Sequence, residues 1–218
     1  MITAHSGSDG YAANSLEFVQ AMLDANVDAI ELDVHMSPDQ TLYLSHDVQD
    51  NWQAYPQLFQ VFEAVVQAGN SNLIINVDCK HGQVGPLALA LARDYQVYDQ
   101  VILSGALDLA NFSQEDRNHL FYNLDNHSDL KSWPVEEWVW VQALADIALS
   151  GVTVVQSYYK IMDELLIDQI HQSGLGISLW TIDDLHEIDQ YLRMGADHIT
   201  TNKALAYRQT SANLTQHD

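Results

Sequence analysis

Hydrophobic and polar residues follow two different rhythms along this chain. Short runs rich in β-branched and other apolar residues are typical of strands, and longer stretches with apolar residues three and four positions apart are typical of amphipathic helices. The two kinds of segment alternate from one end to the other. The predicted strands cover residues 2–5, 29–34, 73–79, 101–104, 120–124, 153–156, 176–180 and 198–200. The predicted helices cover residues 15–25, 57–68, 86–95, 134–149, 162–172 and 183–194.

Eight such units in 218 residues predict the fold class α/β, and within it a single-domain (β/α)₈ TIM barrel rather than an open doubly wound sheet. The unit after the fourth strand is the weakest, because residues 111–118 have poor apolar periodicity and favour a short helix or a loop. A further small strand is predicted at residues 42–45. We expect the barrel to cover residues 1–209 and the polar segment 210–218 to be a frayed tail.

Charge restricts the partners that this chain can have. Thirty acidic residues against eight basic ones give a formal net charge of -22, which repels nucleic acid and anionic membrane surfaces at long range. An anionic substrate would have to be met by a metal ion or by one of those few cations. No apolar run approaches the roughly 20 residues of a membrane span, and no signal peptide is evident. The lone cysteine, Cys79, allows no internal disulfide, so we expect a cytoplasmic protein.

The second predicted strand carries two carboxylates on one face. In the run from Ala29 to His35, Glu31 and Asp33 alternate with apolar residues and therefore project from the same side. Inside a barrel, paired acids are costly to bury unless a cation compensates them. Oxygen ligands favour a divalent metal, Mg²⁺ or Ca²⁺. The alternative is an acidic strand end solvated at the barrel rim.

The third long strand ends in the same way, with Asp78 and Lys80 on one face and Cys79 on the other. A carboxylate and an ammonium at the carboxyl end of a barrel strand suit a metal ligand beside a phosphate-binding cation. A plain salt bridge at the barrel mouth would give the same pattern. Cys79 should face the helices as a packing residue.

Two histidines end predicted strands at the same barrel mouth. His5 precedes a loop with two glycines, and His46 precedes Asp47, which could orient the imidazole ring. Flanking one anion, the two rings could act as general acid and general base. A structural role is the alternative for any single histidine in a chain that has ten.

Several spaced motifs together resemble the glycerophosphodiester phosphodiesterase family. The resemblance runs in order through nearly the whole chain and rests on Ala-His-Ser-Gly at 4–7, Asn-Ser at 14–15, Glu-x-Asp-Val at 31–34, Ser-His-Asp at 45–47, Tyr-Pro-Gln-Leu at 55–58, Asp-x-Lys at 78–80, Leu-Trp-Thr-Ile at 179–182 and Gly-Ala-Asp-His-Ile-Thr-Thr-Asn at 195–202. Any one of these motifs would be weak, whereas their common order is specific.

The resemblance implies metal-dependent cleavage of a small-molecule phosphodiester. By its motifs Glu31, Asp33 and Asp78 would be metal ligands, and His5 and His46 the acid and the base. Lys80 would hold phosphate, and Trp180 would line the substrate pocket. In the family the first attack is thought to come from a neighbouring substrate hydroxyl, which gives a cyclic phosphate that water then opens.

The chain departs from the family pattern at four places. Ser6 replaces an arginine and Ala13 a glutamate, so that an ion pair is missing as a unit. Asp78 stands where the family has a longer glutamate, as in the related sphingomyelinase D group. Residues 47–56 lack the insertion that usually covers the substrate side. We expect an open pocket, and a leaving-group preference of its own.

Lys160 is a candidate replacement for the missing arginine. It follows the sixth predicted strand at the barrel end where the other site residues gather, so its ammonium could reach toward the phosphate as a point charge. A solvated loop lysine is the alternative.

Two other functions are compatible with parts of the pattern. Asp-x-Lys on a barrel strand also resembles the site of orotidine monophosphate decarboxylases, but no second aspartate follows Lys80, and this reading is discarded. The stronger alternative is a catalytically impaired barrel that binds metal and a phosphate ligand without turnover, for which Ser6 is the main support.

Overall fold

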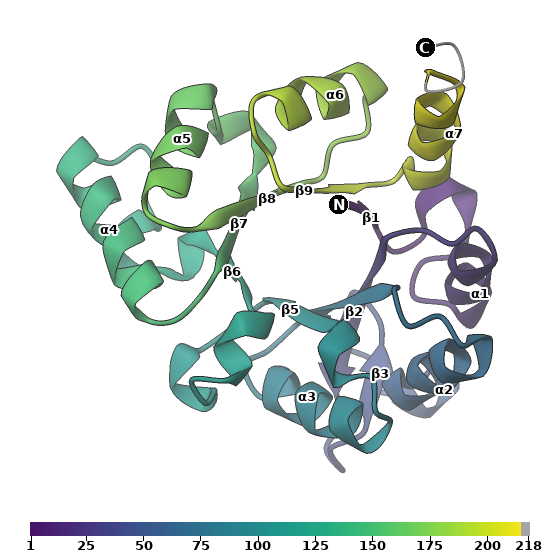
Figure 1. Cartoon of the computed structure of the whole chain (residues 1–218). Helices are drawn as coiled ribbons and strands as arrows, with labels where there is room; N and C mark the ends of the chain where they lie inside the picture. Colours follow the sequence, from purple (N-terminus) through teal and green to yellow (C-terminus); the bar gives the residue numbers. More distant parts are fainter. Residues whose placement is uncertain (215–218) are drawn as a thin grey trace.

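A ring of parallel strands enclosed by helices forms the framework of the protein in a computed structural model, which describes residues 1–214 (Figure 1). The ring strands are β1 (Ile2–Ala4), β2 (Ala29–Met36), β4 (Ile74–Cys79), β5 (Val101–Gly105), β6 (Phe121–Asn123), β7 (Val154–Tyr158), β8 (Gly176–Trp180) and β9 (His198–Thr201). Their order is β5-β4-β2-β1-β9-β8-β7-β6, and one parallel bridge between Leu103 and Leu120 joins β5 to the segment before β6. The predicted eight-stranded barrel is confirmed.

The pleat of the strands decides what faces the barrel interior. Ile30, Leu32 and Val34 of β2 are fully buried and point toward the helices, because successive side chains of a strand face opposite ways. Glu31 and Asp33 therefore face inward. The apolar core lies mainly in the layer between strands and helices, where burial of each such side chain contributes about 1.5–3 kcal/mol.

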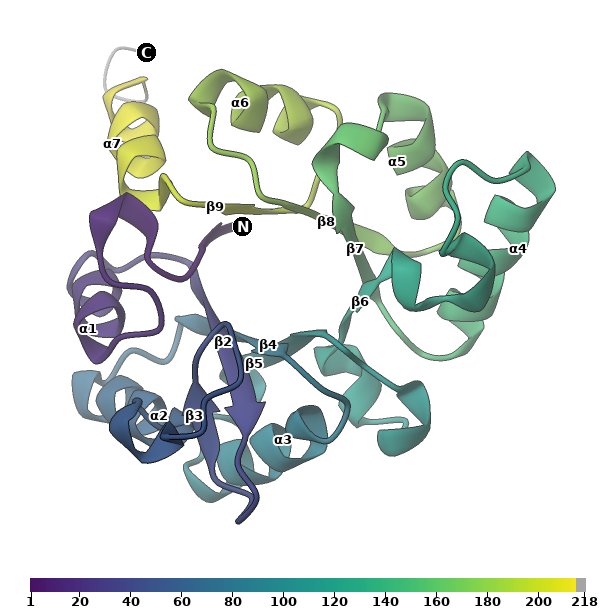
Figure 2. The ribbon, with the colours of Figure 1, turned by 180° about the vertical axis from the view of Figure 1, so that it is seen from behind.

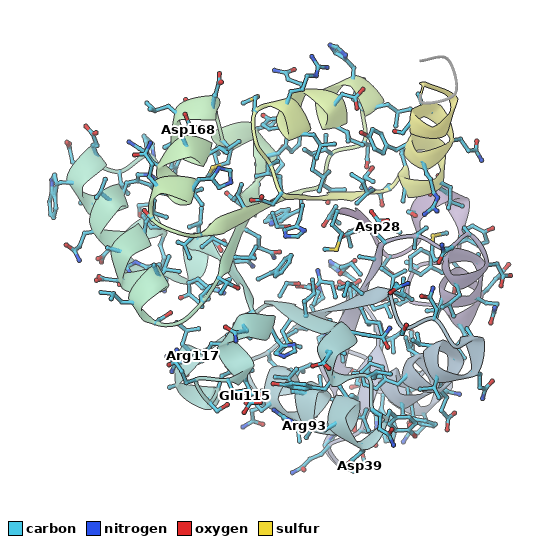
Figure 3. All side chains as sticks on the ribbon, viewed as in Figure 1. Asp28, Asp39, Arg93, Glu115, Arg117 and Asp168 are labelled. Carbon is cyan, nitrogen blue, oxygen red and sulfur yellow. The ribbon has the colours of Figure 1, made fainter. Side chains whose placement is uncertain are left out.

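The helices around the ring are α1 (Leu16–Asp24), α2 (Leu58–Ala68), α3 (Val84–Asp94), α4 (Glu137–Leu149), α5 (Glu164–Gln172), α6 (Leu185–Arg193) and α7 (Ala204–Leu214). Several begin at a side chain that satisfies free backbone N–H groups: Ser15 accepts from Phe18, and Asp163 accepts from Leu166. Labelled charged side chains such as Asp39, Arg93 and Asp168 lie at the outer edge of the molecule (Figure 3).

The predicted small strand is present as β3 (Leu42–Leu44), which pairs antiparallel with β2. Seen from behind, the β2–β3 hairpin extends outward beyond the ring (Figure 2). After β5 there is no α-helix, as the weak periodicity indicated. Two short 3₁₀ helices, η4 (Leu109–Asn111) and η5 (Asp116–His119), connect β5 to β6 instead.

The predicted polar tail needs a correction, because α7 continues to Leu214. Only residues 215–218 of that segment lie outside the described part of the chain. Contacts with distant residues hold the helix: the Tyr207 hydroxyl donates to Asp189 over 2.7 Å, and the Arg208 guanidinium donates to the carbonyl of Asn26. Within residues 1–214, no helix is long and apolar enough to cross a membrane.

Candidate active site

Three carboxylates converge inside the carboxyl end of the barrel, as the sequence predicted. In the parallel pairing of β2 and β4, Asp33 lies opposite Asp78. The pleat puts Glu31 on the same face as Asp33, so one oxygen of each of the three residues lies within 4.8 Å of the others. Glu31 and Asp33 are each only 5% exposed. No local pattern fixes this convergence; the register between the two strands does.

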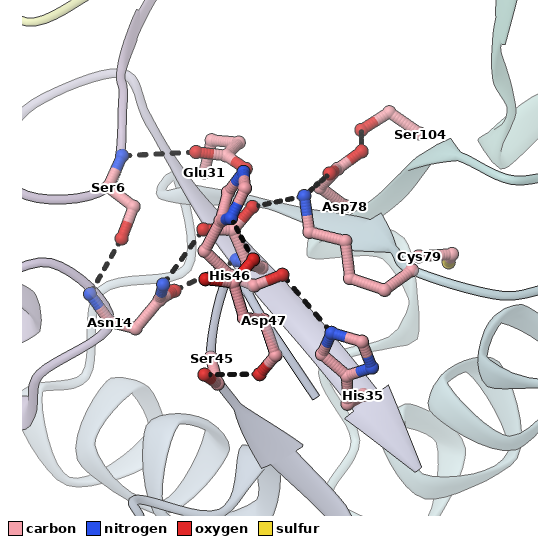
Figure 4. Close-up of polar contacts among 12 residues, drawn as sticks. Ser6, Asn14, Glu31, His35, Ser45, His46, Asp47, Asp78, Cys79 and Ser104 are labelled. Atoms are coloured by element: carbon pink, nitrogen blue, oxygen red, sulfur yellow. Dashed lines mark hydrogen bonds and ion pairs between the residues drawn. The ribbon is translucent and has the colours of Figure 1, made fainter. Parts of the chain in front are cut away.

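Hydrogen bonds hold each carboxylate in place (Figure 4). The backbone N–H of Ser6 donates to Glu31 over 3.0 Å. The Asn14 amide donates to Asp33 over 2.8 Å, while its oxygen accepts the backbone N–H of Asp33 at 2.9 Å. The Ser104 hydroxyl donates to Asp78 over 3.1 Å. The carboxylates are therefore oriented by the fold itself.

Lys80 lies between two of the acids. Its ammonium is 2.6 Å from an oxygen of Asp33 and 2.6 Å from an oxygen of Asp78. Burial lowers the pKa of Lys80, but the charge of Asp78 and the hydrogen bonds to both acids outweigh burial and raise that pKa above its ordinary value. An ammonium has three N–H donors. Two are used here, which leaves one that can be donated to a ligand.

The buried acids differ in their electrostatics. Burial, together with the charges of Asp33 and Asp78, raises the pKa of Glu31 well above its ordinary value. Burial acts on Asp33 in the same direction, but hydrogen bonds from Asn14 and Lys80 outweigh it and lower the pKa of Asp33. One ammonium thus compensates two of the three carboxylates directly, and the third, Glu31, forms no ion pair with a lysine or arginine among the described residues.

These residues fit a divalent metal ion. Three carboxylate oxygens that lie this close together repel each other, and the raised pKa of Glu31 expresses that repulsion and its burial. A hard cation with oxygen ligands would relieve both. Glu31, Asp33 and Asp78 would then hold the ion together.

His5 is oriented by a chain of hydrogen bonds. Its Nδ1 lies 2.9 Å from the side-chain oxygen of Asn202. The Asn202 amide donates in turn to Asp183 over 2.9 Å, and the backbone N–H of Asn202 donates to the same carboxylate over 2.7 Å. Since an amide oxygen only accepts, Nδ1 donates to Asn202, and in the neutral ring Nε2 is then the nitrogen with the lone pair. Nε2 lies 3.8 Å from a carboxylate oxygen of Glu31.

His46 is far more exposed, with 75% of its side chain accessible. Its Nδ1 lies 2.9 Å from Asp47, the partner that the sequence suggested. The carbonyl of His46 lies 3.2 Å from Nε2 of His35, a contact that helps to fix the loop after β3.

A cavity of about 350 Å³ opens above these residues. Its lining consists of His5, Glu31, Asp33, His46, Asn76, Asp78, Lys80, Ser104, Gly105, Asn123, Gln156, Trp180, Thr181 and Thr200. Seven of the eight site residues named from the sequence are thus brought together. The eighth, Lys160, is not among the lining residues; its ammonium lies 5.6 Å from the centre of the Tyr159 ring.

Ser6, which stands where the family has arginine, is a structural residue here. It is 6% exposed, and its hydroxyl accepts the backbone N–H of Asn14 over 2.7 Å. Gly7 beside it has a φ of +80°, and a Cβ there would lie 3.0 Å from Cα of Ala13. The small residues at positions 6, 7 and 13 therefore form a tight loop that positions Asn14 against Asp33.

The pattern along the sequence did not identify several residues that build the site. Asn202 and Asp183 lie far from His5 in sequence, and only their position at strand ends could have suggested them. Gly105 ends β5 with a φ of +81°, and a Cβ there would lie 2.5 Å from Oδ1 of Asp78. Any larger residue would displace that carboxylate. In the sequence, the only indication of this close approach was a glycine directly after a predicted strand.

Known proteins have a similar sequence or a similar fold. A sequence model of the glycerophosphoryl diester phosphodiesterase family matches residues 176–203. A glycerophosphodiester phosphodiesterase of Caldanaerobacter subterraneus is 20% identical, over 93% of this chain and 93% of that protein.

Solved structures show the same fold. A glycerophosphodiester phosphodiesterase from Parabacteroides distasonis superposes with a TM-score of 0.73 at 15% identity, over 98% of this chain and 97% of that one. An Oleispira antarctica phosphodiesterase, solved with the product sn-glycerol-3-phosphate, gives a TM-score of 0.70 at 16% identity, over 96% and 95%. The family model, the relative and the shared fold each indicate a resemblance of this chain to glycerophosphodiester phosphodiesterases.

Proposed function

We propose that this protein is a phosphoric diester hydrolase that cleaves a glycerophosphodiester or a related small phosphodiester. The observation that carries the proposal is the shared cavity, in which two histidines, three convergent carboxylates and one lysine face the same space. The names of the similar proteins support the same reaction class. The barrel fold alone would not support this reaction class, because barrels of this kind host many chemistries.

Different residues of the chain have different roles in the proposed reaction. Lys80 has one N–H free for a phosphate oxygen, and the imidazoles of His5 and His46 supply the proton acceptor and the proton donor. One ring removes the proton from the attacking oxygen while the other protonates the leaving alkoxide. Trp180 lines the cavity beside the substrate. A bound Mg²⁺ or Ca²⁺ would add charge neutralisation at the phosphate.

A substrate panel tests the reaction class. Glycerophosphodiesters, lysophospholipids and an aryl phosphodiester are assayed with Mg²⁺, Ca²⁺, Mn²⁺ or a chelator. We expect turnover of at least one diester that the chelator abolishes. Replacement of His5 or His46 by Ala should lower turnover by roughly two to four orders of magnitude, the usual contribution of positioned proton transfer. Near-normal turnover in both variants would remove the histidines from the mechanism.

Metal binding is measured separately by thermal unfolding, because an ion that binds only the folded state stabilises it by mass action. Mg²⁺ or Ca²⁺ should raise the melting temperature of the wild type. Asp33→Asn should reduce that rise, whereas Asp168→Asn, on the exposed surface of α5, should leave it unchanged. An equal rise in both variants would place the ion elsewhere.

The buried Ser6 favours a second function, that of a catalytically impaired barrel that binds metal and phosphate without turnover. Its hydroxyl is bonded to Asn14 and offers no cation to a phosphate. A metal-dependent rise in melting temperature and binding of inorganic phosphate, without turnover of any diester in the panel, would support this alternative.

We also propose that the protein is located in the cytoplasm. The lone, buried Cys79 supports this location.

A further inference from the structure

The position of His46 depends on its backbone rather than on packing of its side chain. That side chain is 75% exposed. Its ring bonds to Asp47 at 2.9 Å, but Asp47 follows directly in the same loop and would move with it. A proton donor or acceptor must lie within hydrogen-bond reach of the reacting atom. The loop after β3 therefore determines where the His46 ring can act.

A stacked pair of rings lies on the β2–β3 hairpin that carries this loop. His35 of β2 is paired with Tyr43 of β3 in the antiparallel register, and their ring centres are 5.7 Å apart with 19° between the planes. Tyr43 is 1% exposed. The ring centres of Trp52 and Tyr55 lie 6.4 and 6.3 Å from that of Tyr43. Packing therefore fixes the stacked pair independently of the loop.

Each ring of the pair bonds to the backbone of the loop. Nε2 of His35 lies 3.2 Å from the carbonyl oxygen of His46 (Figure 4). Because a carbonyl oxygen only accepts, Nε2 is the donor. The Tyr43 hydroxyl accepts the backbone N–H of Gln49 at 3.0 Å. These two bonds hold both ends of the segment 46–49.

Further hydrogen bonds of Ser45 make the loop a single unit. Its hydroxyl donates to the carbonyl of Asp47 over 2.7 Å, and its backbone N–H donates to the carbonyl of Asp33 over 3.0 Å. A shift of the segment would thus move His46 as a whole relative to the carboxylates. A displacement of about 1 Å can lower a rate by about a hundredfold.

We propose that His35 and Tyr43 are positioning residues that hold His46 at the cavity for proton transfer. Neither is among the lining residues of the cavity, so each acts on the reaction through the loop and not through the substrate. The inference rests on the proposed function, since it takes His46 to be the acid or the base.

Two substitutions each remove one polar contact and keep the ring. His35→Phe and Tyr43→Phe should lower kcat by about ten- to hundredfold and about three- to tenfold, with KM changed by about twofold or less. His35→Gln, whose amide can donate, should restore part of the rate. In a His46→Ala background neither substitution should lower turnover further, because the proton transfer that it supports is already lost.

Hydrogen exchange tests the anchor without turnover. The backbone amides of residues 46–49 should exchange about three- to tenfold faster in both variants. The rise in melting temperature with Mg²⁺ should stay as in the wild type, because no carboxylate has moved.

His119→Phe is the matched control. Nδ1 of His119 lies 2.6 Å from the carbonyl oxygen of Val101, and the ring centre lies 4.1 Å from that of Tyr98. The same kind of contact is thus lost away from the cavity. This variant should lose stability but keep the wild-type kcat and the wild-type exchange of residues 46–49.

The outcomes separate the positioning role from the reaction. If the wild type cleaves a diester and both variants keep its kcat, or lower turnover equally with and without His46, the positioning role is wrong and the proposed function stands. Unchanged exchange of residues 46–49, or a smaller rise in melting temperature with Mg²⁺, would also overturn the positioning role. If the wild type cleaves no diester, both proposals fail. Should one variant not fold, the other still decides.

Discussion

At the scale of single residues, the orientation of His5 depends on two side chains that make no contact with the cavity in the described structure. Asn202 accepts from the His5 ring, and Asp183 receives both the side-chain amide and the backbone N–H of Asn202. This arrangement fixes the tautomer, as the partners of catalytic histidines commonly do. Asn202 and Asp183 are therefore positioning residues for the proposed reaction.

Asn202→Ala should lower turnover by about ten- to hundredfold, with a small effect on KM, because the ring loses its orientation rather than its chemistry. Asn202→Asp keeps the acceptor and should restore part of the rate. The limb of its pH–rate profile that reports His5 should move to higher pH, since a carboxylate stabilises the protonated ring. An unchanged profile in Asn202→Asp would mean that Asn202 only supports the fold.

His198, at the start of β9, provides a separate pH effect on stability. Its Nδ1 is buried and has no hydrogen-bond partner among the described residues, and the centre of its ring lies 4.8 Å from that of Phe121. Burial and the nearby N-terminal ammonium lower the pKa of His198 from 6.5 to about 4. The folded state therefore favours the neutral ring. Its contribution is fully present above about pH 6.5 and is lost as the pH falls toward 4.

His198→Phe should remove this dependence. We expect the wild type to lose up to ~3 kcal/mol of unfolding free energy relative to the variant between pH 7 and pH 4. Urea denaturation of both proteins at several pH values measures the difference, in which the carboxylates common to both cancel. A difference that is constant over this range would contradict the prediction.

At the scale of elements, α7 shows how a weakly patterned helix is fixed by a distant loop. Asp9, in the 3₁₀ helix η1 (Ser8–Gly10), accepts the backbone N–H groups of Leu205 and Ala206 at 3.0 and 3.3 Å. A carboxylate at a helix N-terminus satisfies free donors and interacts favourably with the helix dipole. The start of α7 is thus tied to the loop that follows His5.

Asp9→Gly should destabilise the protein by about 1 kcal/mol, the usual contribution of such a cap. Glycine accepts the positive φ of 56° at this position, so the loss would report the cap and not backbone strain. Asp9→Asn keeps an acceptor and should lose less. The two variants are compared by urea denaturation, and equal stability of Asp9→Gly and the wild type would show that the cap contributes nothing.

At the scale of the whole molecule, the charge of -22 opposes the approach of an anionic substrate. Salt screens this repulsion, since the Debye length falls from about 30 Å at 0.01 M to about 10 Å at 0.1 M. The KM for an anionic diester should therefore fall about twofold or more over that range, with the metal saturating. A KM that rises with salt would show that the local cations at the cavity dominate the approach.

The sequence by itself determined which residues share a face. Alternation over 29–35 placed Glu31 and Asp33 together, and the end of the next long strand placed Asp78 with Lys80, because the two-residue period of a strand is a local property of the backbone. The same local rhythm predicted the barrel, the small strand β3 and the weak unit after β5.

The tertiary structure determined which residues contact the side chains on those faces. The strand register sets Asp33 opposite Asp78, and the ammonium of Lys80 lies between them. His5 bonds to Asn202. These contacts join residues that lie far apart in the sequence or on different strands. The sequence predicted that Lys160 lies at the same barrel end as the site, yet Lys160 does not line the cavity. Contacts of this kind depend on strand order, register and loop conformation, which hydrophobic periodicity does not encode.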